Sequence, residues 1–385
     1  MAARRPTRRH VLGGGLGGLA ALGAGRSTRR NLIGVGNAMA QTTPETVVYV
    51  SNAGSKEVWV LAINRASGEL DLIDKTPVPG NDTPSPTSMP LAVSPDRRFL
   101  YAALRSEPFT VASFAIDKGT GKLRHLGDAP LEASMAYVVT DRTGRWLLGA
   151  SYPQGKLTIN PIDAEGRVEP LPSQVLAGRP KAHCVVVDRS NKYVYCAVLA
   201  QDIILQLKFD PAIGMVSPNT PDSVGTKPGA GPRHMAFHPN GRFLYLLTET
   251  TATIGAYAVD PGNGTLKELQ FVDTLPAGFK EQPSAADLHV TPDGKFLYGS
   301  ERKTSTLTGF RIDPEKGTLS PIGRFPTETT PRGFAIDPRG RFLLSAGLAS
   351  HHLTVHAIEA NGALNPKQQY AMGQMPNWIE FVDLR

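Results

Sequence analysis

MAFHPNGRFLYLLT, residues 235–248, is one of six segments of this chain that share a single pattern. In each segment an apolar run leads into a turn, and Arg or Lys followed by an aromatic residue opens a second apolar run. The other five are LAVSPDRRFLYAAL (91–104), VVTDRTGRWLLGAS (138–151), VVVDRSNKYVYCAV (185–198), LHVTPDGKFLYGSE (288–301) and FAIDPRGRFLLSAG (334–347). The shared aromatics are Phe99, Trp146, Tyr193, Phe243, Phe296 and Phe342, spaced 46–53 residues apart. The chain is therefore built from a structural repeat.

Each repeat continues with two more short apolar runs. A turn separates those two runs, for example DKGTGKL (117–123), DPGNGTL (260–266) or DPEKGTL (313–319). Four short strands joined by tight turns and rich in β-branched and aromatic residues are typical of a propeller blade. The mature chain shows no sustained helical periodicity, so we expect an all-β protein.

The two ends of the chain complete the count of blades. The segment VVYVSNAGS (47–55) matches the second strand of a repeat, and its first strand is missing. The segment MPNWIEFVDL (375–384) matches a lone first strand. We therefore predict a seven-bladed β-propeller with four-stranded blades, whose ring is closed by N- and C-terminal strands within one blade. An open solenoid would need capping units, and the sequence contains none.

Residues 1–40 have the character of an export signal. Arg8 and Arg9 precede a Gly/Ala/Leu stretch, and Ala38-Met39-Ala40 forms a small-residue cleavage site. The arginine pair favours the twin-arginine route, so we expect a periplasmic protein that begins near Gln41. An uncleaved N-terminal anchor is the alternative. The domain prediction is a signal peptide at 1–40 and a propeller at 41–385.

The positive charge of the chain belongs to that leader. Residues 1–40 contain seven arginines and no acidic residue, which accounts for the whole formal charge of +7. The mature protein is close to neutral, so we expect neither nucleic-acid binding nor stable membrane association after cleavage. We expect a monomer. Cys184 and Cys196 fall on adjacent strands, and buried free thiols are favoured over a disulfide.

Polar residues gather at two positions of the repeat. Ten residues before the shared aromatic stand Met89, Ala136, His183, Arg233, Ala286, Arg332 and, by the C-terminal match, Asn377. Six residues after it stand Arg105, Tyr152, Leu199, Glu249, Arg302 and Leu348. Both positions should surround one mouth of the central channel. Ala286 interrupts a polar arc, and we expect its neighbour Asp287 to take its role.

We call these two positions of the repeat the first and the second polar register. Together they predict a catalytic site for an anionic substrate. The catalytic set is His183, Arg233, Glu249 and Arg302, and the substrate-binding set is Arg332, Asn377 and Asp287. Guanidiniums bind anions, while a carboxylate or an imidazole can move a proton. The alternative is an ion-pair network that only joins blades. We expect no metal and no cofactor, because no carboxylate and histidine set has the spacing of metal ligands.

At these residues the sequence resembles a known family. GAGPRHMAFHPNG (229–241), AADLHVTPDGKFLY (285–298), PTETTPRGF (326–334) and SHHLTVHAI (350–358) resemble the seven-bladed propeller lactonases. That family includes the bacterial 6-phosphogluconolactonases and the fungal muconate-lactonising enzymes. The resemblance extends from about Val47 to the end of the chain. It implies that one His, two Arg and one Glu form the active site, at positions that match His183, Arg233, Arg302 and Glu249.

The resemblance implies a lactone hydrolase of the 6-phosphogluconolactonase type. The export signal argues for an unphosphorylated aldonolactone or uronolactone as the substrate, because the phosphorylated lactone is made in the cytoplasm. We expect Glu249 or His183 to deprotonate water without a metal, with the arginines stabilising the oxyanion. A muconate-type cycloisomerase and a surface propeller that only binds proteins or glycans are the alternatives.

Overall fold

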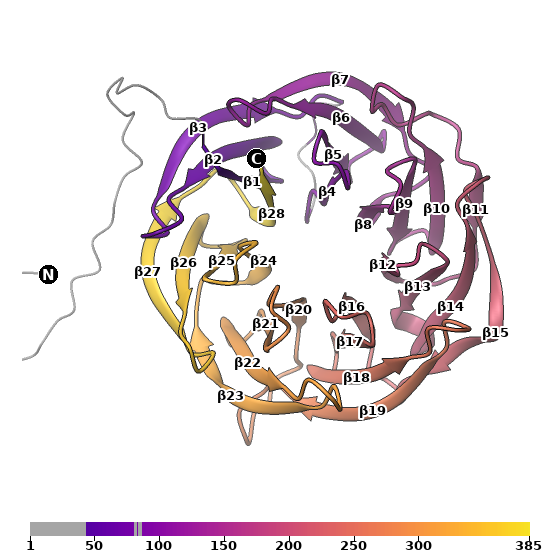
Figure 1. The fold of residues 1–385 in the computed structure, drawn as a ribbon, viewed down its shortest axis with the longest axis vertical. Coiled ribbons are helices and arrows are strands. Elements are labelled where there is room, and N and C mark those ends of the chain that lie inside the picture. Colours follow the sequence, from indigo (N-terminus) through magenta and orange to yellow (C-terminus); the bar gives the residue numbers. More distant parts are fainter. Residues whose placement is uncertain (1–43, 81–82, 84–86) are drawn as a thin grey trace, which may run out of the picture.

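The computed structural model describes residues 44–80, 83 and 87–385. Seven four-stranded antiparallel sheets surround a central channel (Figure 1). The blade that contains both ends of the chain has the order β28-β1-β2-β3. Its strands are β28 (Pro376–Asp383), β1 (Thr46–Asn52), β2 (Glu57–Ile63) and β3 (Leu70–Pro77). The expected signal segment at 1–40 lies outside the described residues.

The other six blades follow in chain order. The first three are β4 (Leu91–Val93), β5 (Phe99–Leu104), β6 (Thr110–Ile116) and β7 (Leu123–Pro130); β8 (Met135–Thr140), β9 (Trp146–Ser151), β10 (Lys156–Pro161) and β11 (Gln174–Leu176); and β12 (Ala182–Val187), β13 (Tyr193–Val198), β14 (Ile203–Asp210) and β15 (Met215–Gly225). The next three are β16 (Pro232–Phe237), β17 (Phe243–Thr248), β18 (Thr253–Val259) and β19 (Leu266–Asp273); β20 (Ala285–Val290), β21 (Phe296–Glu301), β22 (Thr306–Ile312) and β23 (Leu319–Pro326); and β24 (Pro331–Ile336), β25 (Phe342–Gly347), β26 (His352–Ile358) and β27 (Leu364–Ala371). A short 3₁₀ helix, Leu199–Gln201, follows β13.

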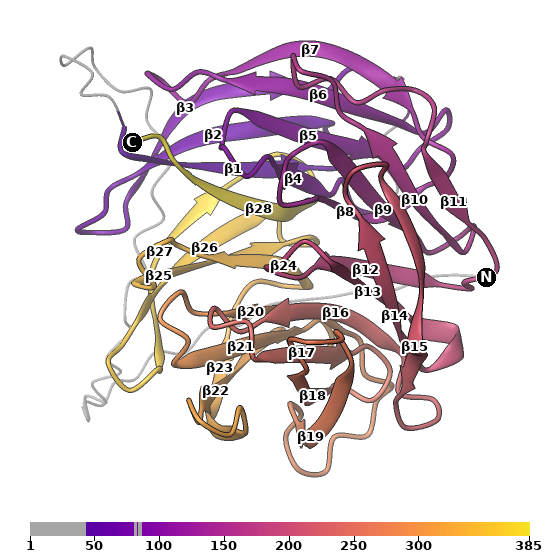
Figure 2. The same ribbon diagram turned by 45° about the vertical axis from the view of Figure 1, so that its right-hand side comes forward.

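The predicted ring closure is confirmed. The C-terminal strand β28 pairs antiparallel with β1, with Ile379 opposite Val50 and Trp378 opposite Ser51 (Figures 1 and 2). The inner strand β28 also packs between β24 and β4, which completes the inner circle of strands. Closure of this kind leaves each inner strand covered on both sides, so the ring has no exposed gap between blades.

The repeat pattern is explained by one joint between neighbouring blades. The shared aromatic of each blade packs against a left-handed glycine in the outer hairpin of the next blade. Tyr193 lies against Gly264 in this way, and Tyr195 donates a hydrogen bond of 2.8 Å to the Gly264 carbonyl. Trp146 with Gly214 and Phe243 with Gly317 repeat the arrangement. The aromatic residue and the glycine of the turn therefore recur because each joint needs both.

Replacing Gly264 with Ala tests this joint. The φ of Gly264 is +69°, and a Cβ there would collide with the Tyr193 ring. Gly178 has a φ of +73°, and a Cβ there would have no atom within 4 Å, so Gly178→Ala is a matched control. The control should lose about 1 kcal/mol for the left-handed backbone, and Gly264→Ala about 1–3 kcal/mol more for overpacking. Urea denaturation measures both, and equal losses would contradict the joint.

The blades are held together by apolar side chains that interlock between sheets. Tyr49 and Val58 of the closing blade share one buried cluster with Leu100 and Phe114 of the next blade. Cys184 and Cys196 are buried free thiols, and they are offset by one position in the pairing of β12 with β13. None of the helices in the described residues is long and apolar enough to cross a membrane.

Candidate active site

Most of the inner strands begin with a β-bulge. The pairing of β12 with β13 passes from Ala182 to Cys184 and leaves His183 unpaired. Arg233 of β16 and Arg332 of β24 are left unpaired in the same way. A bulged residue is released from the alternation of the strand and its side chain is re-aimed, which is why bulges recur beside active sites. The first polar register of the repeat is therefore the bulge position.

The second register begins the hairpin that follows the second strand of a blade. Glu249 directly follows β17, and its backbone N–H donates to the Gly231 carbonyl just before β16. Arg302 directly follows β21, and its N–H donates to the Ser284 carbonyl just before β20. These hydrogen bonds place the hairpins beside the starts of the inner strands, so the two registers meet at one mouth of the channel.

A carboxylate joins two guanidiniums at this mouth. Arg233 Nε donates to Glu249 Oε2 at 3.0 Å, and Arg302 Nη2 donates to Glu249 Oε1 at 2.8 Å. Arg233 is 1% exposed and also donates to the Ala286 carbonyl, while Arg302 Nε donates to the Ser284 carbonyl at 2.8 Å. Burial alone would raise the pKa of Glu249, but the two guanidiniums outweigh it and lower that pKa. Glu249 is therefore ionised and holds both arginines in fixed positions.

Two further arginines, Arg332 and Arg105, lie within electrostatic reach of this cluster. Arg332 is half-buried and has no hydrogen-bond or ion-pair partner among the residues that the structure describes. Its pKa is held well below the ordinary value by burial and then by Arg233, Arg302 and Arg105. Arg105 donates to Ser88 Oγ at 2.8 Å, and burial lowers its pKa to about 10. The mouth is therefore strongly electropositive, and Arg332 is available to a bound anion.

His183 is a neutral imidazole beside this cluster. Its ring lies 5.8 Å from the Tyr152 ring and 5.1 Å from the His234 ring, measured between centroids. Its pKa is well below the ordinary value because of burial, then Arg233, His234, Arg332 and Arg105. A neutral ring of this kind can accept a proton at neutral pH.

The structure brings together five of the seven residues expected from sequence: His183, Arg233, Glu249, Arg302 and Arg332. The side chain of Asn377 is instead engaged inside the protein. Asn377 is 1% exposed, its Oδ1 accepts from the Met89 N–H at 3.0 Å, and its Nδ2 donates to the Met375 carbonyl at 2.6 Å. The hydrogen bond from Met89 connects β28 to the segment before β4.

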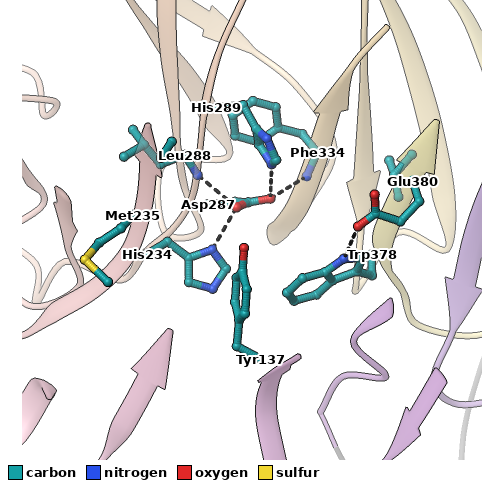
Figure 3. Close-up of a pocket in the computed structure, with 11 residues that line it drawn as sticks. Tyr137, His234, Met235, Asp287, Leu288, His289, Phe334, Trp378 and Glu380 are labelled. Atoms are coloured by element: carbon teal, nitrogen blue, oxygen red, sulfur yellow. Dashed lines mark hydrogen bonds and ion pairs between the residues drawn. The ribbon is translucent and has the colours of Figure 1, made fainter. Parts of the chain in front are cut away.

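Asp287 lies within the channel, beside a cavity of about 220 Å³ (Figure 3). Its Oδ1 is 2.8 Å from His234 Nδ1, and its Oδ2 is 3.2 Å from His289 Nε2. Oδ2 also accepts from the Phe334 N–H at 3.0 Å. The carboxylate is thus engaged by the protein itself and does not belong to the arginine cluster. The bulge in β20 extends from Ala285 to Leu288, so it includes both Ala286 and Asp287.

Sequence reasoning left Arg105 out of the site, although the second register contains it. The signal was an arginine at the same repeat position as Arg302. The expected site was confined to consecutive blades, whereas the ring brings Arg105 within electrostatic reach of His183 and Arg332. Among the described residues, no three His, Cys, Asp or Glu side chains converge as ligands for a metal ion.

The fold is that of a seven-bladed β-propeller, and the arginines at this mouth give it the chemistry to bind an anion. A model of the seven-bladed β-propeller lactonases matches residues 81–381. The chain belongs to this lactonase family, and it is a lactone hydrolase.

Known proteins of the family resemble this chain over nearly their whole length. A 6-phosphogluconolactonase of Pectobacterium atrosepticum is 40% identical over 342 residues, which cover 88% of this chain and 99% of that protein. The 6-phosphogluconolactonase of Erwinia tasmaniensis is 39% identical, over 86% of this chain and 97% of its own. The solved structure of the periplasmic gluconolactonase of Pseudomonas aeruginosa is 27% identical with a TM-score of 0.80, and the match covers 88% of this chain and 99% of that one.

Proposed function

We propose that this enzyme hydrolyses a sugar lactone at the electropositive mouth, and that it does so in the periplasm on an unphosphorylated aldonolactone or uronolactone. The observation that carries the proposal is Arg332, a guanidinium beside Arg233 and Arg302 that has no hydrogen-bond or ion-pair partner within the described part of the protein. A lactone that keeps a second carboxyl group brings an anion to this cluster, and any aldonolactone or uronolactone develops an oxyanion and then a carboxylate as its ring opens. The leader at 1–40 and the periplasmic relative support the location.

The mechanism assigns a separate role to each group at the mouth. His183 takes a proton from the attacking water, because both oxygens of Glu249 already accept from guanidiniums and its pKa is lowered. Arg233 and Arg302 polarise the carbonyl and stabilise the oxyanion, at about 3–4 kcal/mol per donor in comparable sites. The protonated His183 then returns its proton to the leaving alkoxide. Arg332 holds the hydroxyl groups of the substrate and the carboxylate that forms as the ring opens. No step needs a metal, so a chelator should not change the rate.

The same roles predict a difference between two pH profiles. Burial lowers the pKa of free His183 most, and the guanidiniums of Arg233, Arg332 and Arg105 lower it further. A bound anion offsets the guanidiniums. The base works when deprotonated, so the rate falls as the pH drops through its pKa. The kcat/KM profile reports the free enzyme and kcat reports the complex. The acid limb of kcat should therefore lie at a higher pH than that of kcat/KM.

Titration with a pH-stat, on a lactone that stays ionised across the pH range, measures both limbs. One common inflection near the ordinary pKa of histidine would mean that an imidazole outside this cluster is the base, and it would contradict the assignment to His183.

A small panel of substrates tests the function itself. Glucono-1,5-lactone, its 6-phosphate and glucuronolactone are followed by acid release, and cis,cis-muconate by ultraviolet absorbance. We expect kcat/KM for one of the unphosphorylated lactones to equal or exceed that for the 6-phosphate. A tenfold or greater preference for the phosphate would move the substrate to the phosphorylated class. Turnover of muconate alone would indicate a cycloisomerase, and turnover of nothing would indicate a binding propeller.

A further inference from the structure

Polar side chains that follow the bulge positions along the inner strands line a cavity, with Asp287 between His234 and His289 (Figure 3). Asp287 accepts from the Leu288 N–H at 2.9 Å as well as from Phe334, and it contacts His234 and His289. Burial would raise the pKa of Asp287, but the two histidines outweigh it and bring that pKa well below its ordinary value. The carboxylate is therefore ionised, and it can only accept hydrogen bonds.

An ionised Asp287 determines the tautomer of His234. Burial and Arg233 lower the pKa of His234 to about 4, so the ring is neutral and carries one proton. Because Nδ1 lies 2.8 Å from the Asp287 carboxylate, the proton must be on Nδ1. Nε2 is left as an acceptor. This atom is sealed from solvent and has no hydrogen-bond partner in the described part of the chain.

His183 also has a buried ring nitrogen that lacks a hydrogen-bond partner. Its Nδ1 is sealed from solvent, and none of the described residues bonds to it. The His183 and His234 rings have centroids 5.1 Å apart and an interplanar angle of 60°. The two nitrogens make no hydrogen bond to each other in this structure, but a centroid separation of 5.1 Å allows one when a rotation of the His183 ring turns its Nδ1 toward His234 Nε2. Buried nitrogens without partners are costly, and a bond from His183 Nδ1–H to His234 Nε2 would satisfy both.

We propose that Asp287 and His234 are positioning residues that act through His183, in a chain from the carboxylate through His234 Nδ1–H and His183 Nδ1–H to a free Nε2 at the mouth. The proposal rests on the lactonase mechanism above. The chain would fix His183 in the tautomer whose Nε2 can take the proton of water. It would also supply a negative charge when His183 becomes an imidazolium, against the field of the arginines. The base is thereby oriented by a further group, as in other hydrolytic sites.

A purely structural reading of the same contacts is the alternative. Asp287 of β20 accepts from Phe334 of β24 and faces His234 of β16, so it connects three blades. The test must therefore include readouts that a loss of stability alone does not change.

The variant Asp287→Asn retains the shape of the side chain, but its amide nitrogen donates a hydrogen bond where a carboxylate oxygen accepts one. With the amide nitrogen at the position of Oδ1, the side chain would donate to His234 Nδ1, which would move the proton to Nε2 and force His183 into the opposite tautomer. We expect kcat to fall about 10²–10⁴-fold in folded enzyme, as wrong-tautomer substitutions do. Asp141→Asn is the matched control, since Asp141 is fully buried and accepts from Thr143, Arg145 and Trp146 in a turn between β8 and β9. It should lower stability and leave kcat unchanged.

Nitrogen-15 NMR of the histidines in the full-length protein reads the tautomers directly. The chain has nine histidines, so individual replacements can assign their signals. We expect Nδ1–H on His183 and His234 in the wild type, and Nε2–H on both in Asp287→Asn. Nε2–H on His183 of the wild type would overturn the proposal. So would wild-type kcat in folded Asp287→Asn.

A second pair of variants covers the case in which Asp287→Asn does not fold. In His234→Asn the amide nitrogen can still donate to Asp287, but no atom replaces Nε2. In His234→Gln the amide oxygen reaches the position of Nε2 and can accept from His183. We expect a large loss of kcat with Asn and a partial recovery, about tenfold, with Gln. Equal activities of the two variants would contradict the chain.

Failure of the function and failure of this inference remain distinguishable. The NMR experiment needs no substrate, so it tests the chain even if no lactone is turned over. If lactones are hydrolysed and the variants match the wild type, only the positioning role fails. In a His183→Ala background, Asp287→Asn should cause no further loss of kcat, because its effect passes through His183.

Discussion

Replacing Arg332 with Met is expected to raise KM for the lactone about 10²-fold or more while leaving the folded protein at least as stable as before. The guanidinium has no internal partner in the described part of the chain, and three other arginines lie within its electrostatic reach. Its removal relieves repulsion in the free enzyme. In the complex it forfeits charge-assisted hydrogen bonds of about 1.5–3 kcal/mol each. Steady-state kinetics and urea denaturation of one preparation measure the two effects.

Glu249→Gln is the contrasting variant at the same mouth. It leaves Arg233, which is 1% exposed, without its counter-ion. Breaking a buried pair in this way costs about 3–5 kcal/mol, and the partial exposure of Glu249 puts this case at the lower end. Both variants should lose activity, but only Glu249→Gln should lose stability. If Arg332→Met is instead clearly destabilised and keeps its KM, the arginine cluster is a structural network.

Deleting residues 376–385 is expected to abolish the folded ring. The deletion removes β28, which pairs with β1 from Asp383 opposite Thr46 to Pro376 opposite Asn52. It exposes a strand edge, and it forfeits the burial of Ile379 and Val382, at about 1.5–3 kcal/mol for each side chain. It also breaks the ion pair of Asp383 with Arg65. The sum is comparable with the whole stability of a typical domain.

Circular dichroism and size-exclusion chromatography measure the effect of this deletion. A chain that lacks only the exposed Arg385 is the control and should behave as the wild type. A truncated protein that stays monomeric and unfolds cooperatively at the wild-type temperature would show that the terminal strand does not close the ring.

The ring could be predicted from sequence because its joints recur. At six of the seven joints an aromatic residue of one blade packs against a turn glycine of the next, as Tyr193 packs against Gly264, and at the seventh Val47 packs against Gly121. Counting from that aromatic also located His183, Arg233 and Glu249, since the bulges and hairpins repeat with it.

The rest of the site depends on features that cannot be found by counting residues along the repeat. The bulge of β20 includes both Ala286 and Asp287, so register cannot say which of the two faces the arginines. The contact of His183 with His234 joins two adjacent inner strands and depends on the curvature of the ring. Arg105 is far from the other site residues along the chain, and only closure of the ring brings it near.

The central claim is that the electropositive mouth opens a lactone, and acid release tests it most directly. The measurement compares glucono-1,5-lactone alone, with the wild type, and with His183→Ala, in a pH-stat at neutral pH. The account predicts saturable hydrolysis well above the spontaneous rate for the wild type, and a fall toward the spontaneous rate for folded His183→Ala. Hydrolysis at the wild-type rate by that variant would place the chemistry elsewhere and contradict the account.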